Sequence, residues 1–413
     1  MTALITNIHQ LINVREENKL LRGKELAELP FIADAYLVIK DGLIHDYGEM
    51  KDLPSTDYVS GSEIIDAKGA TVLPTWCDSH THIVFAASRE GEFVDKIKGL
   101  SYADIAANGG GILHSAGKLN ETSEDMLFIM AFARLQELMH LGTGAIEIKS
   151  GYGLTVEGEL KMLRVIKKLK AVSPIPIKAT FLGAHAYPLA FKENHQGYIE
   201  QIIREMFPQI AAEQLADYID VFCEDGFFSP EETETICRAG MAIGLKVKIH
   251  ANQLHLSGGT QVGVKLGALS VDHLETMDAD AIQALAKSNT IGTLLPTAAF
   301  FLRMPFQPAR QLVEAGCAIA LASDYNPGSS PSGNMNLVVA MGCIQLKLLP
   351  EEAINAATTN GAYAMELEKE LGTITKGKRA NLIFTRPIPS IAYLPYAFGT
   401  NLIDKVMING AFI

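Results

Sequence analysis

The 413-residue sequence predicts an α/β protein, a (β/α)8 TIM-like barrel with a small β-sandwich domain built from both termini. Short β-like runs with turn signals fill both ends of the chain, and between them eight apolar runs alternate with amphipathic helical stretches. Strands that alternate with helices form parallel sheets. We therefore expect a barrel over residues 73–375 and a composite β domain over residues 1–72 plus 376–413.

Hairpin signals mark both terminal segments. The N-terminal run AYLVIKDGLIHDYG places Asp41-Gly42 between two alternating apolar stretches, and the C-terminal run DKVMINGAFI places Asn409-Gly410 in the same way. Asp-Gly and Asn-Gly pairs fit the tight turns of antiparallel hairpins. Neither segment is long enough to enclose a core of its own, so we expect the two to pair into one domain.

Eight apolar runs that end in polar residues predict the barrel strands. They read IVF directly after the HTH of residues 80–82, then GAIEIKSGYG, IKATFLGAHAY, DYIDVFCEDG, LKVKIHANQ, ALSVDHLE, NTIGTLLPT and CAIALASDYNPG. The stretches between them, such as EDMLFIMAFARLQELMHLG and VEGELKMLRVIKKLKAV, repeat apolar residues at helical spacing. Eight such units favour a barrel over a doubly wound open sheet, which does not ordinarily need eight. No GxGxxG opens a helix and no P-loop is found, which weakens a nucleotide-binding function.

The longest interval between two strands contains LSYADIAANGGGILHSAG. Its glycines Gly109 to Gly111 let a backbone approach a ligand closely. A flexible surface insertion is the alternative interpretation, and the sequence does not decide whether residues 85–120 close over a site.

Composition and charge predict a soluble cytoplasmic protein. The hydrophobic fraction of 48% and the charged fraction of 20% are ordinary for a globular chain. The net charge of −12 argues against nucleic acid or an anionic membrane as a partner, and no apolar run is long enough for a transmembrane helix. Five scattered cysteines without a CxxC pair fit a reducing compartment, and the N-terminus lacks the apolar core of a signal peptide. A small anionic substrate stays compatible, because one well-placed arginine reverses the local field.

The stretch LPTWCDSHTHIVF raises the question of a metal site, because His80 and His82 stand one residue apart. Positions i and i+2 of a strand point to the same face, so both imidazoles can reach one ion. A plain polar strand end is the alternative, since a His-x-His pair alone is a weak motif. The ends of the other strands carry polar residues as well: Glu147, Lys149 and Tyr152 on the second strand, His185 on the third, Glu224 and Asp225 on the fourth, His250 and Gln253 on the fifth, His273 on the sixth, and Asp324 and Asn326 on the eighth. Functional residues of such barrels lie at these ends, so five histidines converging there favour the metal site.

We expect one divalent or trivalent metal ion per chain, zinc or iron, held by His80, His82, His250 and Asp324. Three imidazoles and one carboxylate suit zinc or iron(II) and leave a position for water, whose pKa the metal lowers toward neutrality. Asp324 is then able both to bind the metal and to accept a proton. We expect His185 and His273 to polarise a carbonyl group and to move protons. The alternative for His273 is a residue that only orients a ligand.

This constellation resembles the metal-dependent amidohydrolase superfamily, and the resemblance covers nearly the whole chain. The His-x-His pair, His185, His250, His273 and Asp324 match its ordered positions, and the split β domain matches too. Many dinuclear members carry a carboxylated lysine on strand four, where this chain has DYIDVFCED, so the resemblance implies a single metal. Members that deaminate cytosine or guanine usually have a glutamate three residues after the strand-five histidine. Gln253 stands there instead, and an amide cannot shuttle a proton.

Six segments resemble, more specifically, the members of the superfamily that act in histidine degradation. They are SREGEF, SYADIAANGGGI, EIKSGYGL, FLGAHAYP, SVDHLE and SDYNPGSSPS, in the matching order. The resemblance implies hydrolytic ring opening of 4-imidazolone-5-propanoate, a cyclic amide, to N-formimidoyl-L-glutamate by a metal-activated water. It also implies a homodimer and five substrate contacts: Tyr152, Gln253, Asn326, Gly328 and Ser329. Arg89 and His185 complete the set of seven expected substrate-binding residues.

Arg89 is the expected partner of the propanoate group, because a guanidinium binds a carboxylate through two hydrogen bonds. A solvated surface arginine is the alternative, just as the string NPGSSPS alone is a good turn. Two other functions stay open. A deaminase of a purine, pyrimidine or related heterocycle would release ammonia, whereas ring opening releases none. A non-catalytic barrel would bind no metal.

Overall fold

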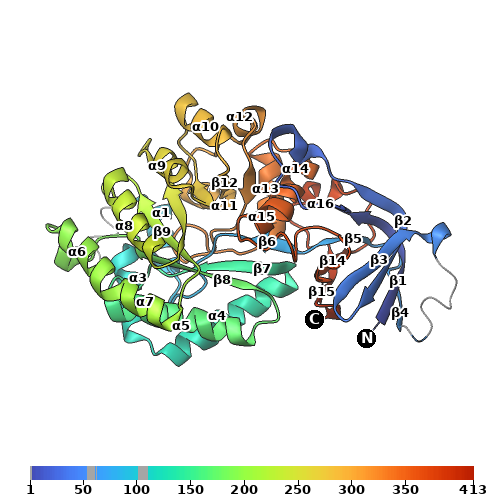
Figure 1. The fold of residues 1–413 in the computed structure, drawn as a ribbon, viewed down its shortest axis with the longest axis horizontal. Coiled ribbons are helices and arrows are strands. Elements are labelled where there is room, and N and C mark those ends of the chain that lie inside the picture. The colour runs from blue at the N-terminus through green and yellow to red at the C-terminus, as the bar shows by residue number, and fades with distance from the viewer. Residues whose placement is uncertain (1, 54–60, 62, 101–109) are drawn as a thin grey trace.

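Eight parallel strands form the centre of the structure, a computed structural model that describes residues 2–53, 61, 63–100 and 110–413. Figure 1 shows them inside the larger part of the molecule, with helices around them. They follow each other around the sheet in chain order. Their bounds are β6 (Trp76–Asp78), β7 (Thr143–Lys149), β8 (Ile177–Ala184), β9 (Tyr218–Cys223), β10 (Lys246–Ala251), β11 (Ser270–His273), β12 (Ile291–Leu294) and β13 (Ile319–Leu321). The predicted (β/α)8 barrel is confirmed.

The barrel closes between its first and last strands just beyond their ends. A parallel bridge joins Thr81 to Tyr325, the amide of His82 donates to Tyr325 O at 2.9 Å, and the amide of Asp324 donates to His80 O at 3.0 Å. The same few hydrogen bonds therefore close the sheet and hold three predicted metal ligands side by side.

The prediction for the first strand is wrong in one part: the two histidines do lie at its C-terminal end, but the run IVF does not form it. The strand precedes the two histidines instead of following them, and Ile83–Phe85 lie outside any described strand. Ile83 and Val84 are fully buried in the apolar core. The guanidinium of Arg134 donates to the carbonyl oxygens of Ile83 and Phe85 at 2.8 and 3.0 Å, so these groups do not join a ladder. An apolar run predicts only that its residues are buried, and residues of strands and of buried loops can both be buried.

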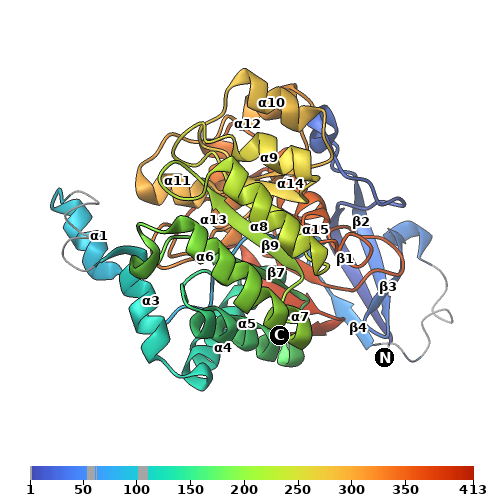
Figure 2. The same ribbon diagram turned by 60° about the vertical axis from the view of Figure 1, so that its left-hand side comes forward.

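Helices cover the outside of the barrel. The two helices foreseen from their periodicity are α4 (Glu124–His140) and α5 (Val156–Val172), and each begins at a capping side chain, Ser123 or Thr155. The other α-helices are α1 (Glu90–Ile97), α3 (Gly111–Glu121), α6 (His195–Gln201), α7 (Phe207–Glu213), α8 (Pro230–Ala242), α9 (Gly259–Leu266), α10 (Ala279–Ala286), α11 (Pro296–Leu302), α12 (Ala309–Glu314), α13 (Met335–Ile344), α14 (Pro350–Ala357), α15 (Thr359–Tyr363) and α16 (Tyr393–Tyr396). Figure 2 shows α1 at the edge of the molecule, far from the terminal sheet.

Strands from both termini combine in a second sheet. They are β1 (Thr2–Ile12), β2 (Phe31–Lys40), β3 (Leu43–Glu49), β4 (Glu63–Asp66), β5 (Thr71–Pro74), β14 (Leu382–Thr385), β15 (Ile403–Ile408) and β16 (Ala411–Phe412). The order β16-β15-β14-β5-β1-β2-β3, with β4 beside β1, places C-terminal strands directly against N-terminal ones. Both predicted hairpin turns are present, because β2 pairs with β3 across Asp41-Gly42 and β15 with β16 across Asn409-Gly410. The domain division at residues 72 and 376 stays a prediction.

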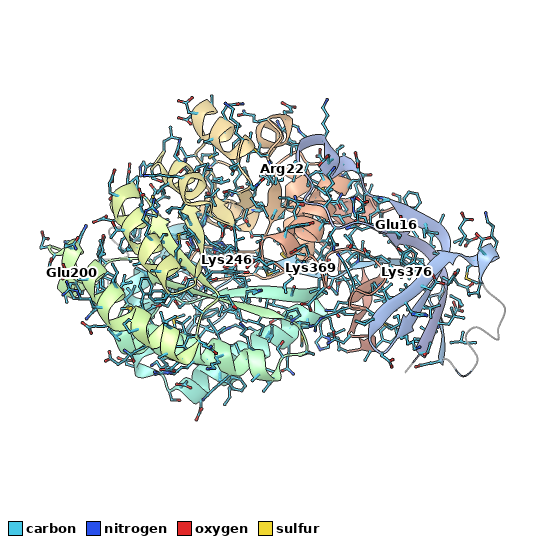
Figure 3. All side chains as sticks on the ribbon, viewed as in Figure 1. Glu16, Arg22, Glu200, Lys246, Lys369 and Lys376 are labelled. Atoms are coloured by element: carbon cyan, nitrogen blue, oxygen red, sulfur yellow. The ribbon has the colours of Figure 1, made fainter. Side chains whose placement is uncertain are left out.

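Several ion pairs join segments that are far apart in the chain, and Figure 3 labels Lys376 and Lys246, which belong to two of them. Lys376 Nζ lies 2.6 Å from the carboxylate of Asp46 on β3, and Lys246, at the start of β10, pairs with Glu366. Exposed ion pairs of this kind contribute little, about 0–1 kcal/mol each. Stability comes instead from the buried apolar residues between the barrel strands and the helices. In the described part of the chain, no helix has the length and apolar character needed to cross a membrane.

Candidate active site

Four predicted metal ligands meet at the C-terminal mouth of the barrel. His80 and His82 follow β6, His250 is the penultimate residue of β10, and Asp324 follows β13. An oxygen of Asp324 lies 3.4 Å from Nε2 of His80 and 3.5 Å from Nε2 of His82. The rings of His80 and His250 are 4.5 Å apart between centroids. All four side chains are buried, so the sequence pattern and the geometry agree on one cluster.

The histidines present the same ring nitrogen to the centre of this cluster. Nδ1 of His80 lies 2.7 Å from Asp272, Nδ1 of His250 lies 3.0 Å from Asp220, and Nδ1 of His82 lies 3.4 Å from Ser150 O. These partners are acceptors, so Nδ1 carries the proton. Nε2 of His80 and of His250 is buried without a hydrogen-bond partner among the described residues. Unpartnered buried lone pairs that converge on one point suit a cation, so the donor set fits zinc or iron(II).

A buried ion-pair network lies directly beneath these ligands. Lys149 Nζ lies 2.8 Å from Asp220, 3.5 Å from Asp272 and 2.6 Å from Glu147, and Lys248 pairs with the second oxygen of Glu147. All five side chains are inaccessible to solvent. Burial opposes charge on Lys149, but the carboxylates of Asp220, Glu147 and Asp272 raise its pKa above the ordinary value. The network therefore keeps Asp220 and Asp272 ionised against the histidines that they orient.

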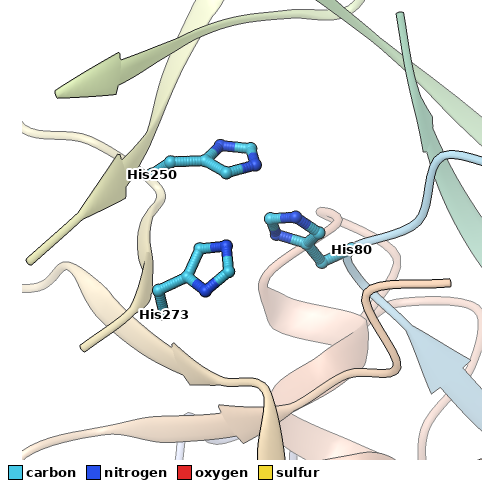
Figure 4. Close-up of side chains that lie close together, drawn as sticks. All are labelled: His80, His250 and His273. Carbon is cyan, nitrogen blue, oxygen red and sulfur yellow. The ribbon is translucent and has the colours of Figure 1, made fainter. Parts of the chain in front are cut away.

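His273 is another histidine of this cluster, and its pKa is shifted in the opposite direction from those of His80 and His82. Figure 4 shows its ring beside those of His80 and His250, and the three together form a second group able to hold an ion. Burial disfavours the charged imidazolium, but the Glu275 carboxylate, 3.4 Å from Nδ1, raises the pKa of His273 above its ordinary value. Gln307 Nε2 donates to the same oxygen of Glu275 at 2.9 Å. The φ angle of +86° at His273 is unusual for a residue with a side chain and is typical of functional sites.

The pKa of His185 is shifted in the opposite direction from that of His273. Its Nδ1 lies 3.0 Å from Gly151 O, and because a carbonyl oxygen only accepts, Nδ1 must donate. Burial lowers the pKa of His185 to about 3, so the ring is neutral at physiological pH. A neutral imidazole protonated on Nδ1 offers a lone pair at Nε2 and therefore accepts a hydrogen bond there. Of the two histidines expected to polarise a carbonyl, His273 is the one whose surroundings favour the protonated form.

A cavity of about 590 Å³ opens above the cluster. All seven predicted substrate-binding residues line it, namely Arg89, Tyr152, His185, Gln253, Asn326, Gly328 and Ser329. Its other lining residues are Lys96, Ile112, Phe222, Phe227, Leu254, Leu302 and Met304. The described lining thus holds two cations and no carboxylate, although the whole chain carries a net charge of −12. The local field therefore favours an anionic ligand.

Two loops at the cavity are fixed by hydrogen bonds from side chains to backbone amides. Glu159 on α5 accepts the backbone amides of Gly151, Gly153 and Leu154, which holds Tyr152 in place. Asn326 Oδ1 accepts the amides of Gly328 and Ser329, each at 2.8 Å, and its Nδ2 donates to Ser329 Oγ at 2.7 Å. Ser329 Oγ in turn donates to Asp324 at 3.1 Å. Asn326 thus shapes the loop that carries Gly328 and Ser329 to the cavity wall.

Glu224 and Asp225, which sequence analysis places at the end of strand four, have a different position from the histidine cluster. Glu224 is buried and accepts the backbone amides of Asp225 and Leu254, and its Oε1 lies 3.0 Å from Nδ1 of His255. Glu224, Asp225 and His255 are close enough to hold an ion. Because the oxygens of Glu224 are engaged by protein donors, its observed role is to anchor a loop.

Sequence reasoning missed Asp220 and Asp272, which orient two predicted ligands, the network role of Lys149, and Glu275 and Gln307 beside His273. One signal was available. Asp220 and Asp272 stand inside strands that are buried on both faces, where a charged residue requires a partner. Gln307 gave no signal, because it lies 32 residues from Glu275 in the chain. Of the three glycines expected to let a backbone approach a ligand, Gly109 lies outside the described residues, and Gly110 and Gly111 form the start of α3.

Comparisons with known proteins agree with this geometry. Residues 71–413 match the Amidohydrolase family. An imidazolonepropionase from Flavobacterium johnsoniae is 59% identical over 414 residues, which cover 100% of both chains. An imidazolonepropionase from Parabacteroides distasonis is 39% identical and covers 98% of this chain and 97% of its own length.

Solved structures support the fold. A guanine deaminase from C. acetobutylicum with bound guanine superposes with a TM-score of 0.71 at 16% identity and full coverage of both chains. A mutant atrazine chlorohydrolase from Arthrobacter aurescens, complexed with zinc and atraton, gives a TM-score of 0.71 at 17% identity, with coverage of 99% and 94%. At these identities the likeness concerns the fold alone. The high identity to the curated relatives goes further, and this chain belongs to the imidazolonepropionases of the amidohydrolase family.

Proposed function

We propose that this chain hydrolyses 4-imidazolone-5-propanoate to N-formimidoyl-L-glutamate, a step of histidine degradation. The observation that carries the proposal is the cavity: seven residues expected to bind this substrate line one space, with two cations at it and the histidine cluster beneath it. The 59% identity to an imidazolonepropionase along the whole chain supports the same reaction.

The substrate has an anionic end and a polar ring, and the cavity has a cationic residue for the first and hydrogen-bonding residues for the second. Arg89 supplies a guanidinium for the propanoate group. His185 offers an acceptor at Nε2, which suits an N–H of the ring, and Gln253 supplies both a donor and an acceptor. Phe222 and Phe227 provide apolar surface between these groups. The ring carbonyl is then expected to lie nearest His273 and Asp324.

His80, His82, His250 and Asp324 are the residues that would hold one metal ion, zinc or iron(II). The unpartnered Nε2 atoms of His80 and His250 and the nearby Asp324 carboxylate support this assignment. An ion bound there acidifies a water molecule and polarises a carbonyl oxygen. Imidazole and carboxylate ligands suit both metals, so the choice between them is a matter for metal analysis.

The proton transfers are assigned from the charges of the side chains. Hydrolysis adds water across the amide bond: oxygen bonds to the ring carbonyl carbon, the adjacent C–N bond breaks, and the leaving nitrogen takes a proton. We assign acceptance of the water proton to Asp324, whose carboxylate Ser329 orients. Burial raises the pKa of Asp324, and a carboxylate in reach of the water is a suitable general base. His273, held by Glu275, is placed to stabilise the oxyanion and to protonate the leaving nitrogen.

Product analysis tests the proposal. The purified, metal-loaded chain is mixed with 4-imidazolone-5-propanoate, and the products are identified by mass spectrometry while ammonia is assayed in parallel. The proposal expects N-formimidoyl-L-glutamate without ammonia. Release of ammonia from a purine or pyrimidine with no turnover of the imidazolone would instead establish a deaminase. The homodimer also stays a prediction, which light scattering on the eluting protein checks.

A further inference from the structure

The cationic end of the cavity is built by one face of the segment that forms α1. Arg89 immediately precedes the helix, Glu92 lies in its first turn and Lys96 in its last. Spacings of three and seven residues place these side chains on the same face of a helix. Both Arg89 and Lys96 line the cavity. The two cations at the cavity therefore come from a single short element.

Glu92 already uses one edge of the Arg89 guanidinium. Nε and Nη2 of Arg89 donate to the same oxygen of Glu92 at 2.9 and 2.6 Å. The other oxygen of Glu92 accepts the backbone amide of Gly111, at the start of α3, at 2.9 Å. The Arg89 and Glu92 side chains are only 11% and 12% exposed, so solvent screens this pair weakly. Glu92 thus orients Arg89 and also cancels most of its charge.

Lys96 is the cavity cation that has no direct partner among the described residues, although the Glu92 carboxylate acts on its charge from a distance. Among the described residues it makes no hydrogen bond or ion pair. Burial and the positive charge of Arg89 lower the pKa of Lys96, and this cost is one that a bound anion would remove. With Arg89 and Glu92 paired, the three side chains leave one positive charge at the cavity. One positive charge is the complement of a monocarboxylate.

We propose that Lys96 is a second carboxylate-binding residue of this cavity, beside Arg89, and that it determines the preference for an anionic substrate. The inference rests on the proposed function, which supplies the propanoate group. In this arrangement Arg89 fixes the direction of the carboxylate through a guanidinium that Glu92 holds still. Lys96 supplies the net positive charge, because the ion pair with Glu92 offsets the charge of Arg89. Neither role touches the bonds that change, so loss of Lys96 weakens binding without slowing chemistry.

Calorimetric titration of three variants with two probes tests this inference. The probes are imidazole-4-propanoate and its neutral carboxamide, which differ only in the charge at the end of the chain. The variants are Lys96→Met, which keeps the apolar stem, Lys96→Arg, which restores a cation, and the matched control Lys98→Met. Lys98 is exposed at the end of the same helix and does not line the cavity. Circular dichroism and metal content are recorded for each variant.

We expect Lys96→Met to weaken binding of the carboxylate about 10- to 100-fold, the scale of a lost charge-assisted hydrogen bond. Its binding of the carboxamide should change less than about twofold, since no charge is lost there. Lys96→Arg should recover most of the affinity for the carboxylate, and Lys98→Met should match the wild type. An equal effect on both probes, or no effect on either, overturns the inference.

Turnover separates this inference from the function on which it rests. In Lys96→Met, KM for 4-imidazolone-5-propanoate should rise in proportion to the lost affinity while kcat stays near the wild-type value. A fall in kcat at unchanged KM would contradict the binding role. A wild-type chain that binds the propanoate probe through Lys96 but does not open the imidazolone ring would leave this inference standing and overturn the proposed function.

Discussion

Asp272 and His80 are joined at the centre of the barrel, with Oδ2 of the carboxylate 2.7 Å from Nδ1 of the imidazole and neither side chain exposed. Asp220 and His250 repeat this arrangement at 3.0 Å, and Lys149 contacts both carboxylates. Each pair fixes a ring so that Nε2 points to the same place. The affinity for a metal ion therefore depends on residues that would never touch it.

Asp220→Asn tests this dependence. Both oxygens of Asp220 accept from His250, one from the backbone amide at 3.0 Å and one from Nδ1. An asparagine accepts with one atom only, so its NH2 group would face an N–H of His250. We expect affinity for zinc to fall about 10- to 100-fold, measured by competition with a chelator. Asp280→Asn, at an exposed carboxylate in the first turn of α10, is the control; a variant of Asp220 that keeps wild-type affinity would refute the orienting role.

Gly328→Ala should displace Arg89. A Cβ atom at residue 328 would lie 2.3 Å from Nη1 of Arg89, and no unusual φ angle complicates the substitution. We expect KM for 4-imidazolone-5-propanoate to rise about tenfold or more with little change in kcat, because the guanidinium loses its position at the carboxylate. Gly91→Ala adds the same methyl group to α1, where it meets nothing within 4 Å, and should leave both constants unchanged.

His273→Ala separates a proton-transfer role from a ligand role. Two groups of residues could hold the ion, one with Asp324 and one with His273. If His273 handles protons and the oxyanion, the variant keeps its metal and kcat falls about 100-fold or more. Metal content by emission spectroscopy and steady-state kinetics are measured on the same sample. Loss of the metal would instead identify His273 as a ligand, and retained turnover would leave it a structural residue.

Lys378 offers a test of stability against pH. Burial lowers its pKa to about 8, and its ammonium donates to Leu371 O and to Thr373 Oγ1. The unfolded chain, with an ordinary lysine pKa, binds this proton more tightly, so the free energy of unfolding should increase as pH rises from 8 to 10. The slope is about 1.4 kcal/mol per pH unit at most. Urea titrations of Lys378→Met should lack this increment; an identical pH dependence in both proteins would contradict it.

The sequence predicted the parts of this molecule that depend on local patterns. Seven strand runs, α4, α5 and both hairpin turns follow from periodicity and turn chemistry, and the histidines at the strand ends follow from the barrel. The first strand did not, because Ile83–Phe85 are apolar for packing while their carbonyls bond to Arg134. Glu92 and Lys96 could not be assigned either. Their role arises from which side of α1 faces the cavity, and an eight-residue helix contains too little pattern to show that.

The most direct test is a metal titration of turnover. The chain is stripped with a chelator, zinc or iron(II) is added back in steps, and the loss of ultraviolet absorbance of 4-imidazolone-5-propanoate is followed at each step. The metal-free chain should be inactive, and activity should rise linearly to a plateau at one ion per chain. His80→Ala should show no such recovery. Full turnover by a chain shown to contain no metal, or a plateau only at two ions per chain, would contradict a single ion held by His80, His82, His250 and Asp324.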